Sequence, residues 1–363
     1  MGEYDGIQRF DRYKHPIFEQ YYNVMESLRW TPKELNFSSD KVGYKKLPIG
    51  IQQIYDLNLM SQTLTDSLIA RFIDGVIMEY VSDPGLELVL STQANFELLH
   101  SFSYSYNIRQ VYPNPTKLFN EYLQSEVIRN RLSMEEEVFN SLHDRFNNAK
   151  DTSARKRLLI EALIHQLALE SVRFFVSFLY TFKINAEYGQ IQGTANNITL
   201  IAQDENIHVT IYAKILELLK TDSSEGFSHI LNTPWYNDKI KSIFNDVIES
   251  ELGWFRELNS RDQIEGMNEH TIFDFLNYYA QKAMSAAKIE GTERVEQNEL
   301  VRFFEQKRNI NARQTAAQET DQLSYNIGVL EDGEFEDTRA MLTNKIDPIA
   351  FMDGLRKEGK NGK

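Results

Sequence analysis

Helix breakers are scarce in this chain, and their scarcity limits what it can fold into. Only 17 glycines and 8 prolines occur among 363 residues. The long windows between them are rich in Leu, Ile, Glu, Gln, Lys and Ala, which favour helix, whereas Gly and Pro destabilise it. No convincing strand hairpin interrupts this pattern. The sequence therefore predicts an all-α protein.

Apolar residues at intervals of three and four positions indicate where the helices lie. The predicted helices span residues 14–29, 49–82, 86–110, 115–127, 134–148, 152–186, 191–220, 236–262 and 269–289. Long antiparallel helices joined by short turns favour a bundle, and such folds hold metals between facing helices.

The chain is longer than a usual domain of roughly 100 to 200 residues, yet no Pro-, Gly- or Ser-rich linker divides it. We therefore predict one helical domain over residues 1–311. Residues 312–363 are polar and acidic and contain few packing groups, which is typical of a flexible tail. The stretch 346–356 in this tail is apolar enough to order on a partner.

The composition excludes several functions. A net charge of -14 makes nucleic acid an unsuitable partner, because phosphate binding relies on Lys and Arg. No apolar run approaches the roughly 20 residues that span a bilayer, and the N-terminus does not resemble a signal peptide. We therefore expect a soluble, cytoplasmic protein that does not bind membranes. The chain has no cysteine, which excludes disulfides and thiolate ligands.

Two of the seven histidines follow a glutamate by three residues, in the pairs Glu97/His100 and Glu205/His208. Roughly one such pair is expected by chance, so neither pair is specific alone. On a helix, however, residues three apart share one face, and both side chains can bind the same metal or adjacent metals.

Di-metal helical bundles need one further carboxylate from each of two other helices. Asp66 interrupts the apolar stripe of the 49–82 helix, and Glu170 precedes a strongly apolar segment. A buried carboxylate is costly unless a cation compensates it. Four carboxylates and two imidazoles form a hard ligand set that suits iron or manganese better than a thiolate-loving metal.

Tyr104 lies on the same predicted helix face as Glu97 and His100, one turn beyond the histidine. A phenol beside a metal pair is relevant to redox chemistry. On the neighbouring helices, apolar side chains follow Glu170 by four and eight residues and precede Glu205 by four. We expect them to wall Tyr104 off from water: Phe174, Phe178 and Ile201.

Together these motifs resemble the small, radical-generating subunit of class I ribonucleotide reductase, over roughly residues 5–330. The matching positions agree in order and spacing along the chain: Asp66, Glu97-x-x-His100-x-x-x-Tyr104, Glu170-x-x-x-Phe174-x-x-x-Phe178 and Asp204-Glu205-x-x-His208. The resemblance implies a ferritin-like helical homodimer with extra helices. It also implies two iron ions per chain, bound by Asp66, Glu97, His100, Glu170, Glu205 and His208, and oxidation of Tyr104 by O2 to a stable radical.

The same resemblance implies a route for the radical. Trp30 and Asp204 match the family's electron and proton route, in which Asp204 hydrogen-bonds His100. In the tail, Glu319 and Tyr325 match the segment that carries the radical to the large subunit. Because reduction of ribonucleoside diphosphates uses cysteine chemistry and this chain has none, the large subunit must bind the substrate and supply the thiols.

Several positions depart from the best-known bacterial members of that family. Gln203 stands where they have Arg, Phe96 where they have Ser, and Gln93 and Val89 replace tryptophans. These changes bear on the reduction of the metal pair and on alternative electron routes. The chain also runs well past Tyr325 and ends in a basic stretch, so the extreme C-terminus is not taken as the anchor on the large subunit. We expect the anchor in 327–337 or 346–356 instead.

Alternatives remain at this point. Manganese suits the same ligands as iron. Another di-metal oxidase, such as a fatty-acyl desaturase or a ligand-binding oxidase, would share the fold, but these generally have Glu at the first ligand position and lack the radical tyrosine. An inactive structural or regulatory bundle, or an iron store, is favoured only if a ligand is lost, and none is. The remaining histidines lack the acid at the right spacing and are expected to be structural or exposed: His15, His143, His165, His229 and His270.

Overall fold

The computed structural model describes residues 8–316, and every regular element in that range is helical. The predicted all-α fold is therefore confirmed. The α-helices are α1 Ile17–Ser27, α2 Ser38–Gly43, α3 Ile49–Phe72, α4 Pro84–Val111, α5 Pro115–Leu123, α6 Glu126–Asn148, α7 Thr152–Ala168, α8 Phe175–Tyr188, α9 Gln192–Thr221, α10 Ser228–Leu231, α11 Pro234–Asn259, α12 Glu269–Ala286 and α13 Glu299–Ala316.

Each predicted helix has a counterpart, but two of them are interrupted by wider π-helical turns. The 49–82 prediction becomes α3 followed by the π turn Ile73–Ile77 and a short 3-10 turn. The 152–186 prediction becomes α7 and α8 joined by the π turn Leu169–Arg173. A π turn inserts one residue into a helix and shifts the apolar positions after it by one residue, a shift that the three- and four-residue spacing used here did not identify.

Three helices were not predicted: α2, α10 and α13. The first two are short. In α13, three buried apolar residues, Leu300, Val301 and Phe304, suffice to pack the helix despite its polar composition. This helix crosses residue 311, where the sequence placed the domain boundary. Residues 317–363 lie outside the described part of the chain.

Local sequence signals explain where α4 begins and where α8 ends. Asp83 precedes α4, and its carboxylate accepts a hydrogen bond from the Leu86 backbone N–H at 3.0 Å, while Pro84 occupies the first helical position. This is a favourable N-terminal cap. At the end of α8, Gly189 adopts a φ of 64°, a left-handed conformation that favours glycine.

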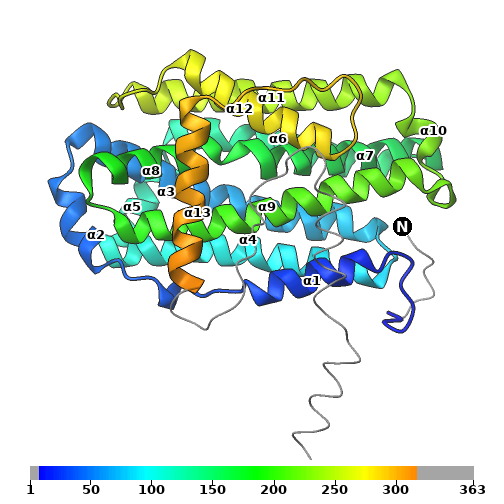
Figure 1. Ribbon diagram of the computed structural model, residues 1–363, viewed down its shortest axis with the longest axis horizontal. Helices are drawn as coiled ribbons and strands as arrows, with labels where there is room; N and C mark the ends of the chain where they lie inside the picture. The colour runs from blue at the N-terminus through cyan, green and yellow to red at the C-terminus, as the bar shows by residue number, and fades with distance from the viewer. Residues whose placement is uncertain (1–7, 317–363) are drawn as a thin grey trace, which may run out of the picture. The chain divides into compact units, whose positions relative to one another are not determined.

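The long helices lie side by side, as Figure 1 shows, with α4 packed against α3 and α9 packed against both α7 and α8. Helix α13 crosses the others and contacts α8 and α9. The segments that carry the predicted ligands are thus brought to the same core: α3, α4, the π turn after α7, and α9.

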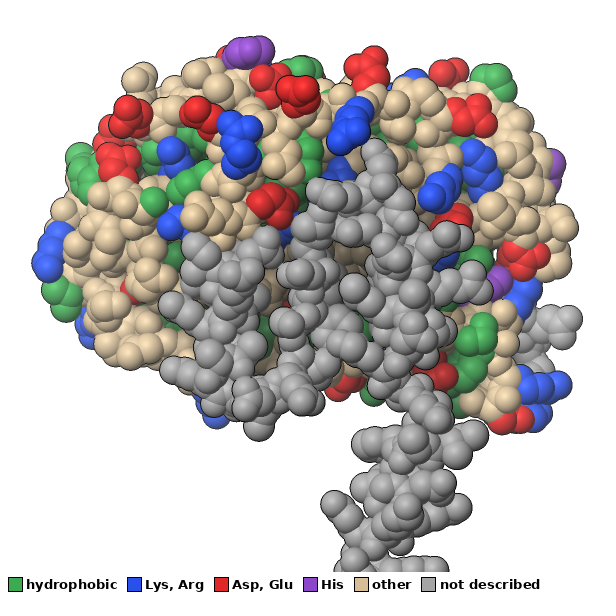
Figure 2. All heavy atoms as spheres, viewed as in Figure 1, with side chains coloured by type: hydrophobic (Ala, Val, Ile, Leu, Met, Phe, Trp, Pro, Cys, Tyr) green, Lys and Arg blue, Asp and Glu red, His purple; other side chains and the backbone are tan. Residues whose placement is uncertain are grey.

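The stretch Thr152–Tyr188 is long and apolar enough to cross a membrane by length and composition. Its most apolar window, however, is completely buried inside the protein, so it is the central core segment of the bundle. On the face drawn in Figure 2, acidic and basic side chains are interspersed over the described surface.

Two arginines and two glutamates form a buried, charge-balanced network behind the π turn. Arg173 contacts Glu135 at 2.8 Å and Glu251 at 3.1 Å, while Arg131 contacts Glu251 at 2.6 Å. The Arg131 guanidinium also lies 4.8 Å from the centre of the Trp254 ring. The network therefore ties the turn to α6 and α11.

We predict that Arg173→Met destabilises the protein by about 3–5 kcal/mol, because two buried carboxylates would then share one arginine. The matched control is Arg145→Met. Arg145 pairs with Glu161, but its side chain is 48% exposed, so the loss should stay below about 1 kcal/mol. Denaturant unfolding of the three proteins at equal metal content measures both. Equal losses in the two variants would contradict the assigned role of the network.

Candidate metal centre

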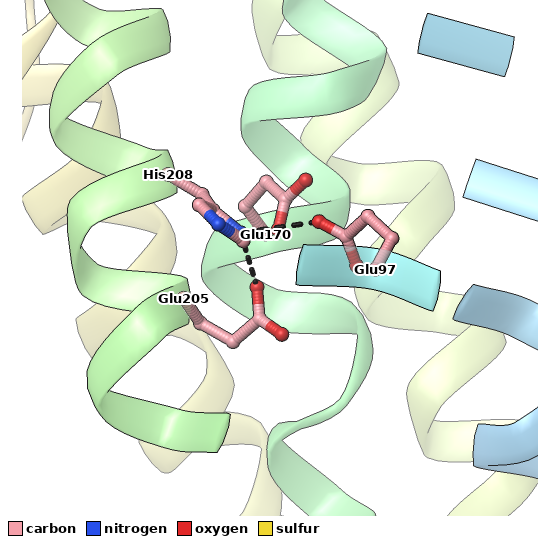
Figure 3. Close-up of side chains that lie close together, drawn as sticks. All are labelled: Glu97, Glu170, Glu205 and His208. Atoms are coloured by element: carbon pink, nitrogen blue, oxygen red, sulfur yellow. Dashed lines mark hydrogen bonds and ion pairs between the residues drawn. The ribbon is translucent and has the colours of Figure 1, made fainter. Parts of the chain in front are cut away.

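Six buried side chains from four segments converge in the core. Glu97, Glu170, Glu205 and His208 offer ligand atoms that all lie within 4.8 Å of one another, and so do Asp66, Glu97 and His100. Figure 3 shows the first group, with Glu205 and His208 on α9 facing Glu170 and Glu97 across the gap. The structure thus brings together all six residues that the sequence assigned to metal binding.

Two of the carboxylates face both histidines. Glu97 presents one oxygen to His208 Nδ1 at 3.1 Å and the other to His100 Nδ1 at 3.7 Å. Glu205 does the same, with one oxygen 3.3 Å from His100 Nδ1 and the other 3.1 Å from His208 Nδ1. Glu97 and Glu205 would therefore each be able to hold both ions of a metal pair.

The other two carboxylates belong to one side each. Asp66 lies 4.0 Å from His100 Nδ1, whereas Glu170 lies 3.3 Å from His208 Nδ1. One position is therefore surrounded by Asp66 and His100, and the other by Glu170 and His208. The two imidazole rings are 6.0 Å apart.

Several polar atoms of these residues are buried and have no hydrogen-bond partner. They include both carboxylate oxygens of Asp66, Glu97 Oε2, Glu205 Oε1 and His100 Nδ1. Buried polar groups are nearly always satisfied, so orphaned atoms that point to a common centre need an explanation. A pair of divalent cations would satisfy these oxygen and nitrogen donors, and the residues present fit that ligand.

The electrostatics of the cluster point the same way. Burial raises the pKa of Asp66 and of Glu170 well above the usual value, and the neighbouring carboxylate Glu97 adds to both. Burial alone would lower the pKa of His100 and His208, but the surrounding carboxylates raise both instead. Without cations the cluster must hold protons to limit the repulsion between its carboxylates. Two divalent cations would offset the four negative charges.

The π turn Leu169–Arg173 carries Glu170 into the cluster, and two amides hold it there: Gln93, already noted as a departure from the family, and Gln166, which the sequence analysis missed. Gln93 Nε2 donates to Glu170 Oε1 at 2.8 Å, and Gln166 Nε2 donates to the same oxygen. The second oxygen of Glu170 faces His208. The amides thus orient one oxygen of Glu170 toward the metal position.

Asp204 connects the cluster to Trp30. One carboxylate oxygen accepts a hydrogen bond from the Trp30 indole at 2.8 Å and lies 3.0 Å from His100 Nε2. The Trp30 and His100 rings are nearly parallel, with centroids 6.2 Å apart. Because Nε2 donates to Asp204, Nδ1 of His100 is left to face the metal position.

Tyr104 is completely buried, and its hydroxyl has no hydrogen-bond partner. Tyr104 follows His100 by four residues on α4, which puts both on nearly the same face of the helix. Burial raises the pKa of this phenol well above its usual value, and the charges of Asp66, Glu205 and Glu97 raise it further. The three apolar residues expected to surround it, Phe174, Phe178 and Ile201, are also buried. Their role as walls stays a prediction.

The departures have structural consequences. Gln93 hydrogen-bonds Glu170, and the Phe96 ring packs edge-on against His100 and His208 at 6.4 and 6.3 Å. Val89 is a core residue. Gln203 has a buried side-chain nitrogen without a partner.

Two predicted relay residues, Glu319 and Tyr325, lie outside the described residues, as do both candidate anchor segments.

The structure also contains a residue that sequence reasoning missed. Tyr212 on α9 is completely buried and follows His208 by four positions, as Tyr104 follows His100. The repeated spacing was visible in the sequence.

A third group of metal-binding residue types lies elsewhere, formed by His15, Asp222 and Glu225. Lys14 already occupies this place: its ammonium contacts Glu225 and lies 3.6 Å from Asp222. His15 lies 3.0 Å from Glu225 as well. Because the positive charge of Lys14 compensates these acids, the central cluster is the better candidate.

Comparison with known proteins adds independent information. The sequence model of the family "Ribonucleotide reductase, small chain" matches residues 8–292. The ribonucleoside-diphosphate reductase subunit beta of Buchnera aphidicola subsp. Baizongia pistaciae is 29% identical over 93% of this chain and 94% of that protein. The subunit beta of enterobacteria phage T4 is 28% identical over 75% of this chain and 76% of its own length.

Solved structures share the fold. The ribonucleotide reductase R2 subunit from Clostridium botulinum matches with a TM-score of 0.72 at 18% identity and covers 85% of this chain and 92% of its own. The dimanganese(II)-NrdF of Streptococcus sanguinis matches with a TM-score of 0.63 at 16% identity, covering 83% of this chain and 99% of its own.

We predict that the protein binds two metal ions per chain and that the loss depends on the residue removed. Glu97→Ala should impair both positions, because Glu97 faces both histidines, whereas His208→Ala should impair one. His165→Ala is the matched control, since His165 is a buried histidine on α7. Metal analysis after reconstitution counts the ions. Full loading of both ligand variants would refute the site.

Proposed function

Because this chain belongs to the ribonucleotide reductase small-chain family, we propose that it holds two iron ions and uses O2 to oxidise Tyr104 to a radical. The chain is the small subunit of a ribonucleoside-diphosphate reductase and works with a large subunit. The observation that carries the proposal is the two-sided cluster, in which Glu97 and Glu205 each face both histidines while Tyr104 lies buried beside them.

In this proposal Asp66 and His100 hold one ion, Glu170 and His208 hold the other, and Glu97 and Glu205 hold both. When bound, the ions would reduce O2, and the reduced oxygen would serve as the oxidant of Tyr104. Manganese is the second candidate, because the ligands suit it equally and the matched Streptococcus sanguinis protein is named as a dimanganese form.

Tyr104 stores the oxidising equivalent as a neutral radical after losing one electron and its phenolic proton. Its complete burial supports this role, because water and external reductants are kept from the ring. Phe174, Phe178 and Ile201 would form the apolar walls around it. The same burial disfavours a charged phenolate, so the proton leaves together with the electron.

Trp30 and Asp204 form the route between the cluster and the outside of the helices. The carboxylate of Asp204 joins the indole N–H of Trp30 to Nε2 of His100. Burial raises the pKa of Asp204, and the hydrogen bonds from His100 and Trp30 oppose this rise. Asp204 therefore fixes the protons of the Trp30 indole and the His100 imidazole through hydrogen bonds while an electron passes between Trp30 and the cluster.

We assign the last part of the route to the tail, through Glu319 and Tyr325, with an anchor on the large subunit at 327–337 or 346–356. This chain has no cysteine, so the thiols that reduce the nucleotide come from the large subunit. We also propose that the protein acts in the cytoplasm.

A homodimer is proposed from an exposed apolar pair on α4. Leu98 and Phe102 are 51% and 49% exposed, on the side of α4 that faces away from Glu97 and Tyr104. One turn apart, they form an apolar strip that a second copy of the chain would cover. Sedimentation analysis tests this: Leu98→Lys with Phe102→Lys should shift the protein toward the monomer, and an unchanged dimer would assign its interface elsewhere.

We predict that Tyr104→Phe still binds metal and consumes O2 but lacks the persistent tyrosyl radical of the wild type, because phenylalanine has no phenolic proton and is much harder to oxidise. Electron paramagnetic resonance with metal analysis, after iron or manganese and O2 are added to the metal-free protein, measures radical and metal together. A persistent radical of unchanged spectrum in the variant would assign it to another residue.

Tyr325→Phe should keep the metals, the Tyr104 radical and binding to the large subunit, because it removes one hydroxyl and little contact area. Nucleotide reduction with the large subunit should nevertheless fall to near background, since the route between the subunits is cut. Activity near wild type would remove Tyr325 from the route and leave the metal site standing.

A further inference from the structure

The pattern Glu-x-x-His-x-x-x-Tyr occurs twice, as Glu97/His100/Tyr104 on α4 and as Glu205/His208/Tyr212 on α9. On a helix the tyrosine lies about 6 Å along the axis from its histidine and on nearly the same face. The two histidines face the two metal positions, His100 with Asp66 and His208 with Glu170. A phenol therefore flanks the metal pair on each side.

The surroundings of Tyr212 resemble those of Tyr104. Both side chains are completely buried; the Tyr104 hydroxyl has no hydrogen-bond partner, whereas the Gln93 amide lies beside the Tyr212 hydroxyl. Burial raises the pKa of Tyr212 well above its usual value, and the charges of Glu170 and Glu97 raise it further. For Tyr104 the corresponding charges are those of Asp66, Glu205 and Glu97. Each ring thus lies within electrostatic reach of the carboxylates on its own side of the cluster.

Other buried tyrosines in the described residues lack this combination. Tyr180 on α8 is also completely buried with an unpartnered hydroxyl, but burial alone raises its pKa. No carboxylate of the cluster influences it. Burial and an unpartnered hydroxyl are therefore common to several tyrosines, whereas closeness to the metal ligands distinguishes Tyr104 and Tyr212.

We infer that Tyr212 is a second redox-active tyrosine of the metal centre, which donates one electron and its phenolic proton when O2 is reduced there. The inference rests on the proposed function, because O2 and the metal pair are the oxidant. Reduction of O2 to two waters takes four electrons and four protons. The two metal ions would supply one electron each, and Tyr104 supplies one electron and one proton, which leaves one electron and three protons to be found; two of these protons come from solvent.

Tyr212 supplies this last electron from inside the protein, and its phenolic proton leaves in the water that is formed. The product is a neutral Tyr212 radical on the Glu170 side of the cluster. Gln93, which hydrogen-bonds Glu170, also influences the Tyr212 hydroxyl. The amide beside the Tyr212 ring distinguishes its surroundings from those of Tyr104, and we expect the Tyr212 radical to be the shorter-lived of the two.

The experiment compares rapidly frozen samples of the full-length protein, taken from the first moments after iron and O2 are added. The proteins are wild type, Tyr104→Phe, Tyr212→Phe, the double variant with both changes, and the control Tyr104→Phe with Tyr180→Phe. Metal content and O2 consumption are measured on each. Ring-deuterated tyrosine identifies the electron paramagnetic resonance signals that belong to tyrosine.

We expect Tyr104→Phe to show a short-lived tyrosyl signal that is narrowed by the deuterium label. Adding Tyr212→Phe should abolish this signal, whereas adding Tyr180→Phe should leave it. The signal should also resist microwave power saturation, because the nearby metals speed its relaxation, and this measurement needs no change at Tyr212. The inference would be overturned if Tyr104→Phe showed no early tyrosyl signal. It would also be overturned if the signal persisted in the double variant with Tyr212→Phe.

The outcomes separate this inference from the function on which it rests. A persistent wild-type radical that is lost in Tyr104→Phe supports the proposed function, whatever Tyr212 does. If that radical instead persists in Tyr104→Phe and disappears in Tyr212→Phe, the role of Tyr104 is refuted and that of Tyr212 is supported.

Discussion

The fold depends on the burial of four carboxylates and two imidazoles in one apolar core. Asp66, Glu97, Glu170 and Glu205 are almost completely buried, and their mutual repulsion is strong where the dielectric constant is low. Among the described residues, no lysine or arginine pairs with Glu97, Glu170 or Glu205; only histidines do. The cluster must therefore take up either protons or cations, and two divalent cations would offset its four negative charges.

The protein buries charge in two different ways within a few residues of each other. Glu170 and Arg173 lie on the same π turn, yet Arg173 points away from the metal ligands and neutralises Glu135 and Glu251. The network is balanced by its own side chains, which anchors the turn to the neighbouring helices. The metal cluster is left with an excess of carboxylates. This separation keeps an arginine from competing with the metals.

The sequence predicted most of the centre because its spacing is local. Glu97 and His100, or Glu205 and His208, share a face in any straight helix, so their pairing needed no tertiary information. The repeated tyrosine spacing is equally local, so Tyr212 could also have been identified from the sequence. By contrast, the Gln166 bond to Glu170, the Arg173 network and the bridging orientation of Glu97 depend on how distant helices pack. The π turn at Glu170 was not visible in the regular apolar spacing, and the part of α13 whose side chains the structure describes packs through three buried apolar residues.

The most direct test of the central claim is X-ray diffraction at the iron absorption edge from crystals of the iron-reconstituted protein. The account predicts two anomalous peaks per chain, one contacting Asp66 and His100 and the other contacting Glu170 and His208, with Glu97 and Glu205 contacting both. A single peak, or metal bound at His15, Asp222 and Glu225 with none in the buried cluster, would contradict it.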